Sequence, residues 1–218
     1  MWLTNSSVGR KVVMSVTGLF LVLFVTFHAL MNAVALIKFE YYEAICEFLG
    51  ANWYAVAGTL VLAAGFVIHI IFAFILTFQN RKARGNDRYA VTARPKNVEW
   101  ASQNMLVLGI IVLGVMVLHL TQFWAKMQLP ELMGEAHLSG YEALKATFSH
   151  VWVLPIYLIW FAALWFHISH GFWSAFQTLG TANDNWIPRW QCISKWWASI
   201  VFILFAVEAC YFTWFFAL

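Results

Sequence analysis

The sequence predicts an all-α integral membrane protein, built as a bundle of five transmembrane helices. Of its 218 residues, 62% are hydrophobic and 11% are charged, and the mean hydropathy is +0.73. A soluble domain carries about 25% charged residues, so we expect most of this surface to face lipid. The charged residues leave four uncharged gaps, and a fifth that only Glu208 interrupts, each longer than the roughly 20 residues a helix needs to cross a bilayer.

The gaps divide the chain, read as a single domain (1–218), into five spans. Helices are expected because a lipid-buried backbone must satisfy its own hydrogen bonds, and the short alternating segments of a β-barrel are not seen. Arg10 and Lys11 lead into an apolar stretch too long for a signal peptide, so the first span is expected to be an uncleaved insertion signal. Pro155 falls in the first turns of the fourth span, where it need not break the helix. The spans are predicted at 12–37, 52–79, 102–126, 149–178 and 195–217.

The loops alternate in charge, which orients the bundle. One side holds ten basic residues and the other three, and the second side also carries six glutamates. The positive-inside rule therefore predicts a cytoplasmic N-terminus and an outer C-terminus. The basic residues of the first side are Arg10, Lys11, Arg81, Lys82, Arg84, Arg88, Arg94, Lys96, Arg189 and Lys195, and those of the second are Lys38, Lys126 and Lys145.

The three cysteines form no paired motif. Cys46, Cys192 and Cys210 lie far apart, with neither CxxC nor CxxCH spacing. The pattern argues against a disulfide framework, a zinc knot, an iron–sulfur cluster and covalently attached haem.

Five histidines lie deep in the predicted spans, and four of them form two level pairs. At 1.5 Å per residue, His28 and His119 lie about 24 and 25 Å from the cytoplasmic ends of their helices, and His69 and His167 lie at about 15 and 16 Å. A single buried histidine often makes only a helix–helix hydrogen bond. Two level pairs on four helices, about 10 Å apart, are the arrangement that bis-histidine ligation of two stacked haems requires. We therefore predict two haem b groups, one between His28 and His119 and one between His69 and His167.

His170 is the fifth of these histidines and lies one turn from His167. It could replace His167 as the inner ligand, or bond a haem propionate or a loop carbonyl. The glycines near the ligands (Gly18, Gly58, Gly65, Gly109, Gly114 and Gly171) would let a porphyrin approach the backbone, although glycines also promote tight packing of membrane helices.

Four stretches of the chain share the pattern of a known family, in register across the first four spans. They are residues 15–21 with His28, residues 66–69 followed by Arg81 and Lys82, residues 117–120, and His167 followed by Gly171, Trp173, Ser174 and Gly180. On these residues the chain resembles the cytochrome b membrane-anchor subunit of succinate:quinone oxidoreductases, that is, succinate dehydrogenase and fumarate reductase. The resemblance is to the single-polypeptide form with five helices and two haems b.

The resemblance implies the partners and the route that the electrons take. Such an anchor binds an iron–sulfur subunit on its cytoplasmic side, and that subunit carries a flavoprotein with FAD. Electrons pass through iron–sulfur clusters to the inner haem, then the outer haem, and exchange with menaquinone in the inner membrane of a bacterium. This places the chain in the tricarboxylic acid cycle or anaerobic respiration, and is compatible with a dimer of complexes. The cytoplasmic loops 80–101 and 181–190 fit a docking role, although a basic loop also sets topology and meets anionic lipid.

The resemblance also assigns roles to single residues. It favours His167 over His170 as the inner ligand, and counts Ser15 and His170 among the cofactor-binding residues. Glu40 is similar to the outer-side carboxylate that exchanges protons beside the quinone site. Glu43 and Glu47 compete for that role, and an exposed acidic loop without a role is the alternative.

The chain departs at one position from the pattern of the family that it resembles, and one acidic residue in a span has no assigned role. Some dihaem members carry a glutamate two residues before the fourth-span ligand, thought to conduct protons, where this chain has Trp165. Glu208, a lone acid in the last span, has no role in the pattern. Two other classes remain open: a cytochrome b anchor of another respiratory enzyme, such as a hydrogenase or formate dehydrogenase, and a transporter or channel with polar helix contacts.

Overall fold

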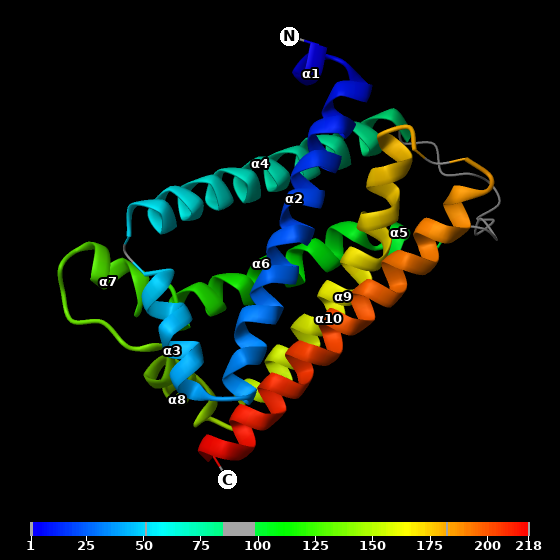
Figure 1. Cartoon of the computed structure of the whole chain (residues 1–218). Coiled ribbons are helices and arrows are strands. Elements are labelled where there is room, and N and C mark those ends of the chain that lie inside the picture. Colours follow the sequence, from blue (N-terminus) through cyan, green and yellow to red (C-terminus); the bar gives the residue numbers. More distant parts are fainter. Residues whose placement is uncertain (1, 51, 85–98, 182, 218) are drawn as a thin grey trace.

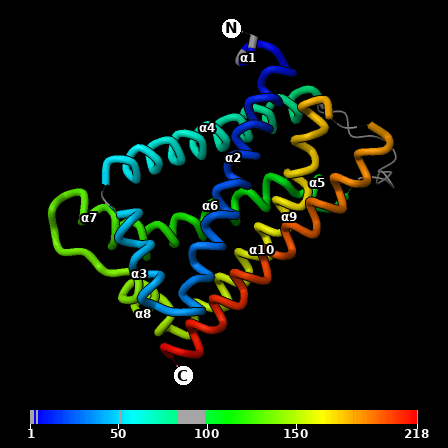
Figure 2. The backbone as a smooth tube through the Cα atoms, in the orientation of Figure 1, coloured from blue at the N-terminus to red at the C-terminus, as the bar shows by residue number. Residues whose placement is uncertain are grey.

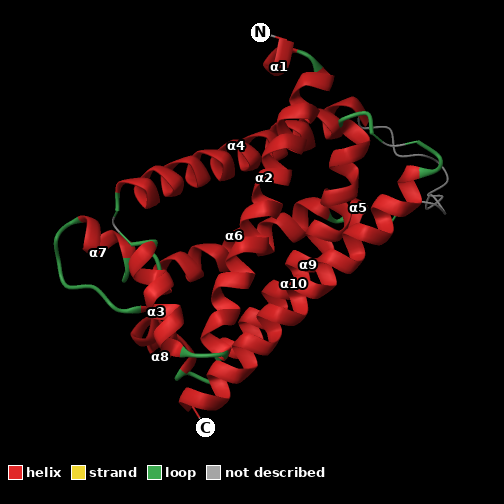
Figure 3. Cartoon of the chain, in the orientation of Figure 1, coloured by secondary structure: helices red, strands yellow, loops and turns green. Residues whose placement is uncertain are grey.

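The computed structural model describes residues 2–50, 52–84, 99–181 and 183–217, which form helices joined by turns, with no strand among them (Figure 3). Five helical segments are long and apolar enough to cross a membrane: Ser7–Leu36, Trp53–Ala83, Met105–Gln122, Val153–Thr178 and Trp186–Ala217. The prediction of an all-α, multi-pass membrane protein with five spans is therefore confirmed.

The described helices include five short ones besides the long ones, and a 3-10 turn. In chain order they are α1 (Trp2–Asn5), α2 (Ser7–Ala33), η1 (Val34–Leu36), α3 (Phe39–Phe48), α4 (Trp53–Arg84), α5 (Trp100–Gln103), α6 (Met105–Gln122), α7 (Gln128–Leu132), α8 (Gly140–Phe148), α9 (Val153–Thr178) and α10 (Trp186–Ala217).

Local capping moves two helix starts away from the predicted positions. α2 begins at Ser7 rather than at residue 12, because the Ser6 hydroxyl accepts a hydrogen bond from the backbone N–H of Gly9 at 2.9 Å. α10 begins nine residues before the predicted residue 195. There the Asn183 side chain accepts from the backbone N–H of Trp186 at 3.0 Å. Charge gaps locate the lipid-buried part of a helix, whereas capping groups decide where its backbone begins.

α9 lies at the centre of the bundle. It packs against α2, α6 and α10, and α2 packs in turn against α4 and α10. Figure 2 shows α9 and the orange-to-red α10 running alongside each other, with α2 crossing both. α9 and α10 supply much of the core, whereas no residue in the most apolar window of α4 is buried within the chain.

The bundle has two ends, which we name the α5 end and the α8 end. Figure 1 shows the N-terminal part of α2, α5 and the beginning of α10 toward the first, and α3, α8 and the C-terminus toward the second. Lys195 near the start of α10 forms an ion pair with Glu99, just before α5, at 3.2 Å. The sequence prediction makes the α5 end cytoplasmic and the α8 end the outer one.

Residues that the charge pattern treats as outer loops form short helices at the α8 end. Glu43 of α3 accepts hydrogen bonds from the backbone N–H groups of Gly140, at 3.1 Å, and Tyr141 at the start of α8. Ser139 and Glu142 form a capping box at the same helix start. Glu43 therefore connects α3 to α8 across nearly a hundred residues of sequence.

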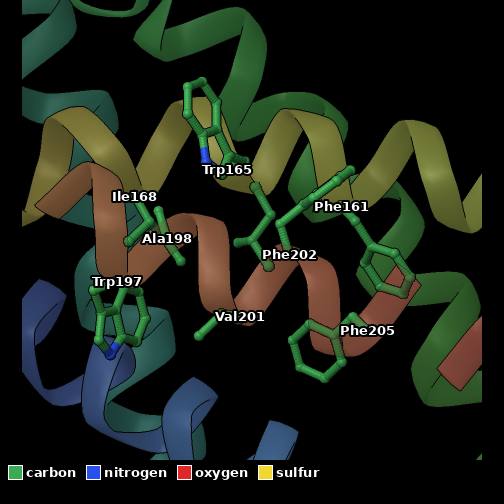
Figure 4. A pocket seen from close by; sticks show the side chains of 9 residues that line it. Phe161, Trp165, Ile168, Trp197, Ala198, Val201, Phe202 and Phe205 are labelled. Atoms are coloured by element: carbon green, nitrogen blue, oxygen red, sulfur yellow. The ribbon is translucent and has the colours of Figure 1, made fainter. Parts of the chain in front are cut away.

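The interface between α9 and α10 is apolar and closely packed. Figure 4 shows a narrow pocket there, and the indole N–H of Trp165 donates to the Ser199 hydroxyl at 3.0 Å. Side chains from both helices thus fill the space between α9 and α10. The pocket is lined by Phe161, Leu164, Trp165, Ile168, Trp197, Ala198, Val201, Phe202 and Phe205.

The two predicted docking loops differ in how much of them is described. In the loop 80–101, Arg88, Arg94 and Lys96 lie outside the described residues. The segment 181–190 is partly helical, because its last five residues belong to α10. There Arg189 lies over the ring of Trp186, 5.1 Å from its centroid, a cation–π contact.

Candidate metal centres

The structure brings His28 of α2 and His119 of α6 together toward the α8 end. Their ring centroids are 5.8 Å apart and the ring planes are perpendicular. Aromatic side chains surround both rings, so this pair lies in an apolar shell. Phe24 and Phe205 contact His28, and Phe123, Tyr157 and Trp160 contact His119.

The second pair is His69 of α4 and His167 of α9. Their ring centroids are 6.4 Å apart and the planes meet at 67°. The four histidines therefore meet in the combinations that their depths predict, and each pair joins two alternate spans, the first with the third and the second with the fourth.

Both separations are close to the distance expected for two imidazoles on one metal ion. With metal–nitrogen bonds of about 2.0–2.1 Å and about 1.1 Å from Nε2 to the ring centre, the centres of two opposite axial ligands lie about 6.3 Å apart. A haem iron takes four ligands from the porphyrin and has two axial positions for protein. The described residues contain no group of three or more His, Cys, Asp or Glu side chains placed to bind one metal ion, and a pair of histidines falls below that number.

A hydrogen-bond network orients the His119 ring. Its Nδ1 lies 3.3 Å from the Tyr157 hydroxyl, and Tyr157 donates to the side-chain oxygen of Gln122 at 2.7 Å. Because Tyr157 donates its hydroxyl proton to Gln122, its oxygen can only accept a hydrogen bond from His119. The proton of the neutral His119 ring is therefore on Nδ1. Nε2 then keeps a free lone pair, which is the form of histidine that binds a metal.

His69 is oriented in a similar way by Thr17 of α2. Its Nδ1 lies 3.3 Å from the Thr17 hydroxyl, which donates to the backbone carbonyls of Val13 and Met14 at 2.9 and 3.1 Å. The hydroxyl proton is used within α2, so Thr17 accepts from His69. His69 therefore also presents Nε2 as its basic nitrogen.

His167 has no comparable partner for Nδ1. That atom is buried and makes no hydrogen bond with the described residues. Instead the ring lies against a glycine of α6: a Cβ added at Gly109 would be 3.6 Å from Cε1 of His167. Gly18 of α2 faces His69 more closely, at 3.3 Å from Cε1.

The other glycines of the predicted motif have different neighbours. A Cβ at Gly171 would meet the end of Met105 of α6, at 3.9 Å, so Gly171 faces α6. Gly180 has φ +81° directly after α9, a left-handed conformation that glycine adopts without steric cost. Its place in the motif is therefore explained by the end of the helix.

Ser15 is buried on α2, one turn before Gly18. Residues three apart lie on the same face of a helix, so Ser15 belongs to the face that meets His69. Thr17, Gln122 and Tyr157 were not among the predicted site residues. Polar side chains within otherwise apolar spans are the signal that could have found them.

His170 makes a different contact from His167. Its Nδ1 lies 3.2 Å from one carboxylate oxygen of Glu99, and Lys195 lies 3.2 Å from the other. Burial raises the pKa of Glu99, while the hydrogen bonds from His170 and Lys195 lower it, and the net result is a pKa below the ordinary value. His170 thus connects α9 to the start of α10, and His167 is the residue that faces His69.

Glu40 is exposed at the α8 end and pairs with Lys38. The described contacts do not join it to the His28–His119 pair, so its role as a proton acceptor stays a prediction. Glu43 is occupied in capping α8, which argues against it as a competitor, and Glu47 is exposed.

Fold and site together define a five-span membrane protein with two intramembrane histidine pairs, each suited to bind a metal ion from opposite sides. Comparisons of the chain with protein-family models, curated proteins and solved structures find no match.

Proposed function

We propose that this chain is a dihaem cytochrome b that anchors a succinate:quinone oxidoreductase and passes electrons between its cytoplasmic subunits and membrane menaquinone. The observation that carries the proposal is the presence of two histidine pairs on four helices, with ring centres 5.8 and 6.4 Å apart. Chance could bring one such pair together, but two pairs at a distance that a single metal ion can bridge support the proposal that both pairs bind the same kind of group.

The residues present fit a haem b in each pair. His28 and His119 would hold the outer haem, and His69 and His167 would hold the inner one. A bound haem b supplies one-electron chemistry at its iron. The hydroxyls of Tyr157 and Thr17 hold one imidazole of each pair in the ligating tautomer, and aromatic side chains surround the outer pair.

The assignment to this enzyme class rests on the sequence resemblance. It implies an iron–sulfur subunit and an FAD-bearing flavoprotein subunit at the α5 end, where Arg10, Lys11, Arg189 and Lys195 lie. Succinate and fumarate would interconvert on the flavoprotein, and this chain would carry the electrons and the quinone site.

Haem counting tests the central part of the proposal. Acid-acetone extraction followed by a pyridine haemochrome assay of the purified chain should give two non-covalent haems b per polypeptide. One haem per chain, a haem that stays attached, or a colourless protein would contradict it.

Co-purification tests the enzyme class. A tagged chain isolated gently from its own membranes should bring an FAD protein and an iron–sulfur protein with it, and succinate should reduce its haems. Reduction by formate or hydrogen instead of succinate would favour the alternative respiratory anchors.

A further inference from the structure

Glu208 is a buried acid in α10 that the proposed function does not use. The residue is 5% exposed, and its Oε1 is buried without a hydrogen-bond partner among the described residues. No ion pair found in the described part of the chain includes it. A buried carboxyl group without a partner is expensive in a membrane, and such groups usually carry a function.

Its position places Glu208 next to the outer histidine pair. Phe205, one turn earlier on α10, contacts the His28 ring at 6.0 Å between centroids and stacks on Phe161 of α9 at 5.2 Å. Figure 4 shows Phe205 at this end of the α9–α10 interface. Glu208 therefore lies about 4.5 Å further along α10, toward the α8 end.

Tyr42 of α3 is the titratable group whose protonation is influenced by Glu208. The pKa of Tyr42 is raised, mainly by burial and then by the neighbouring Cys46 thiol and the Glu43 and Glu208 carboxyls. The phenol therefore stays neutral. Burial also raises the pKa of Cys46, to about 11. These groups of α3 therefore offer Glu208 no positive charge.

The other helices packed against α10 add no cation beside Glu208. On α2 the basic residues Arg10 and Lys11 lie in the first turns, at the other end of the helix, and the His28 ring contacts Phe205. On α9 the nearest titratable group along the helix is Tyr157, which is bonded to Gln122, while His167 and His170 lie closer to the α5 end. The charged residues of α8, Glu142 and Lys145, are exposed.

Two buried hydroxyls at the same end also lack partners. Thr147 of α8 and Thr213 of α10 are each 2% exposed, and neither hydroxyl is hydrogen-bonded to a described residue. α8 packs directly against α10. Buried polar groups of this kind are ordinarily satisfied by ordered water.

We propose that Glu208 is a redox-linked proton acceptor, which binds one proton when the haem held by His28 and His119 gains one electron and releases it when that electron leaves. This inference rests on the proposed function. The oxidised haem carries one positive charge more than the reduced haem, and that charge favours the ionised carboxyl group. At about 10 Å and an effective dielectric constant of about 20, two unit charges change each other's affinity for a proton by about tenfold.

The step balances in charge and in atoms. The Glu208 carboxylate would take up one proton from the aqueous phase and become a neutral carboxylic acid, and this proton would offset the charge of the one electron that a haem held by His28 and His119 would accept in the proposed function. Glu208 thus provides, beside the outer haem, a place for a proton that accompanies electron transfer toward the quinone.

A spectroelectrochemical titration of the purified, haem-loaded chain at several pH values tests the inference. The midpoint potential of the outer haem should fall by about 59 mV in total as the pH rises through the titration of Glu208, which is a tenfold change in affinity for a one-electron couple. Glu208→Gln should remove this dependence and keep two haems. Glu135→Gln, which removes an exposed carboxylate at the same end, should retain it.

The outcomes separate this inference from the proposed function. A two-haem protein whose outer potential does not vary with pH, or a Glu208→Gln protein that keeps the variation, overturns the inference alone. A chain that binds no haem overturns the proposed function. If Glu208→Gln does not fold, the wild type still decides: its redox-induced infrared difference spectrum should contain a deuterium-sensitive band of a protonated carboxylic acid, and Glu208→Asp should shift it.

Discussion

The two histidine pairs are built from similar ligands but held by different surroundings. Bulky rings from several helices surround His28 and His119. Around His69 and His167, the described ring contacts consist of the pair itself, and two glycines lie beside the imidazoles. The His28–His119 pair is therefore enclosed by aromatic side chains, whereas the His69–His167 pair lies against two glycines and the Thr17 hydroxyl.

This difference shows that two histidine pairs of the same kind can be held in place in two ways, by bulky aromatic neighbours or by close contact with glycines. An aromatic shell tolerates the loss of one ring, because its neighbours still exclude water. A glycine contact is less tolerant, because one added methyl group moves the imidazole directly. The two pairs should therefore respond differently to small changes nearby.

The largest effect should come from removing the ligands. His28→Ala and His119→Ala should lose the same haem, and His69→Ala and His167→Ala the other one, because each iron needs both axial nitrogens. Each variant should retain about one haem per chain in the pyridine haemochrome assay, with one spectral component missing. His150→Ala, at an exposed position, serves as control. If His28→Ala and His69→Ala lose the same component, the pairing is wrong.

Replacing each of the two glycines by alanine should show which of the two contacts, Gly18 with His69 or Gly109 with His167, matters more for the inner pair. Gly18→Ala places a Cβ 3.3 Å from His69, closer than most real contacts, whereas Gly109→Ala places one at an ordinary 3.6 Å from His167. We expect Gly18→Ala to weaken retention of the inner haem by about tenfold and Gly109→Ala to change it less than about twofold. Haem retention during dilution measures both.

Gly114→Ala is the matched control, because an added Cβ there meets nothing within 4 Å. Alanine favours a helix over glycine by about 1 kcal/mol, so a loss in Gly18→Ala cannot come from helix propensity. Equal behaviour of Gly18→Ala and Gly114→Ala would contradict the role of the close contact.

Removing the hydroxyl group that bonds to one histidine of a pair should change the midpoint potential of the haem at that pair alone. Tyr157→Phe removes the acceptor for His119, and Thr17→Val removes the one for His69. A lost hydrogen bond of about 1 kcal/mol makes the ligand less basic and should raise the midpoint potential by up to about 40 mV. Tyr157→Phe should move only the outer haem and Thr17→Val only the inner one, as seen in redox titrations followed at each component. A shift of both haems in either variant would contradict this assignment.

The smallest effect concerns the ion pairs at the α5 end. The pKa of Glu99 is lowered in the folded protein, so its contribution to stability is present above the ordinary glutamate pKa of about 4.3 and is lost as the pH falls through the lowered value. Thermal unfolding of the wild type should show this acid loss, and Glu99→Gln should show less of it. The difference should be small because Lys195 is 53% exposed.

His170→Ala should likewise change the stability near Glu99 while retaining two haems. If this variant lost the inner haem, the assignment of His167 as ligand would be reversed.

The sequence alone determined the number of spans, the helical class and the levels of the histidines. Each is a one-dimensional quantity, because a helix in a bilayer rises by a fixed distance per residue and its length is limited by the membrane. His28 and His119, or His69 and His167, can therefore be matched in depth before any packing is known.

Only the tertiary structure decided what depends on rotation and on lateral neighbours. His170 is turned by about 60° from His167 around α9, which directs it to Glu99, and depth cannot distinguish the two. The contacts of Tyr157, Thr17 and Glu208 likewise depend on which helices lie side by side. In lipid the apolar periodicity that orients a helix in a soluble protein is weak, because the surroundings are as apolar as the core. Helix orientation therefore had to come from packing and polar contacts.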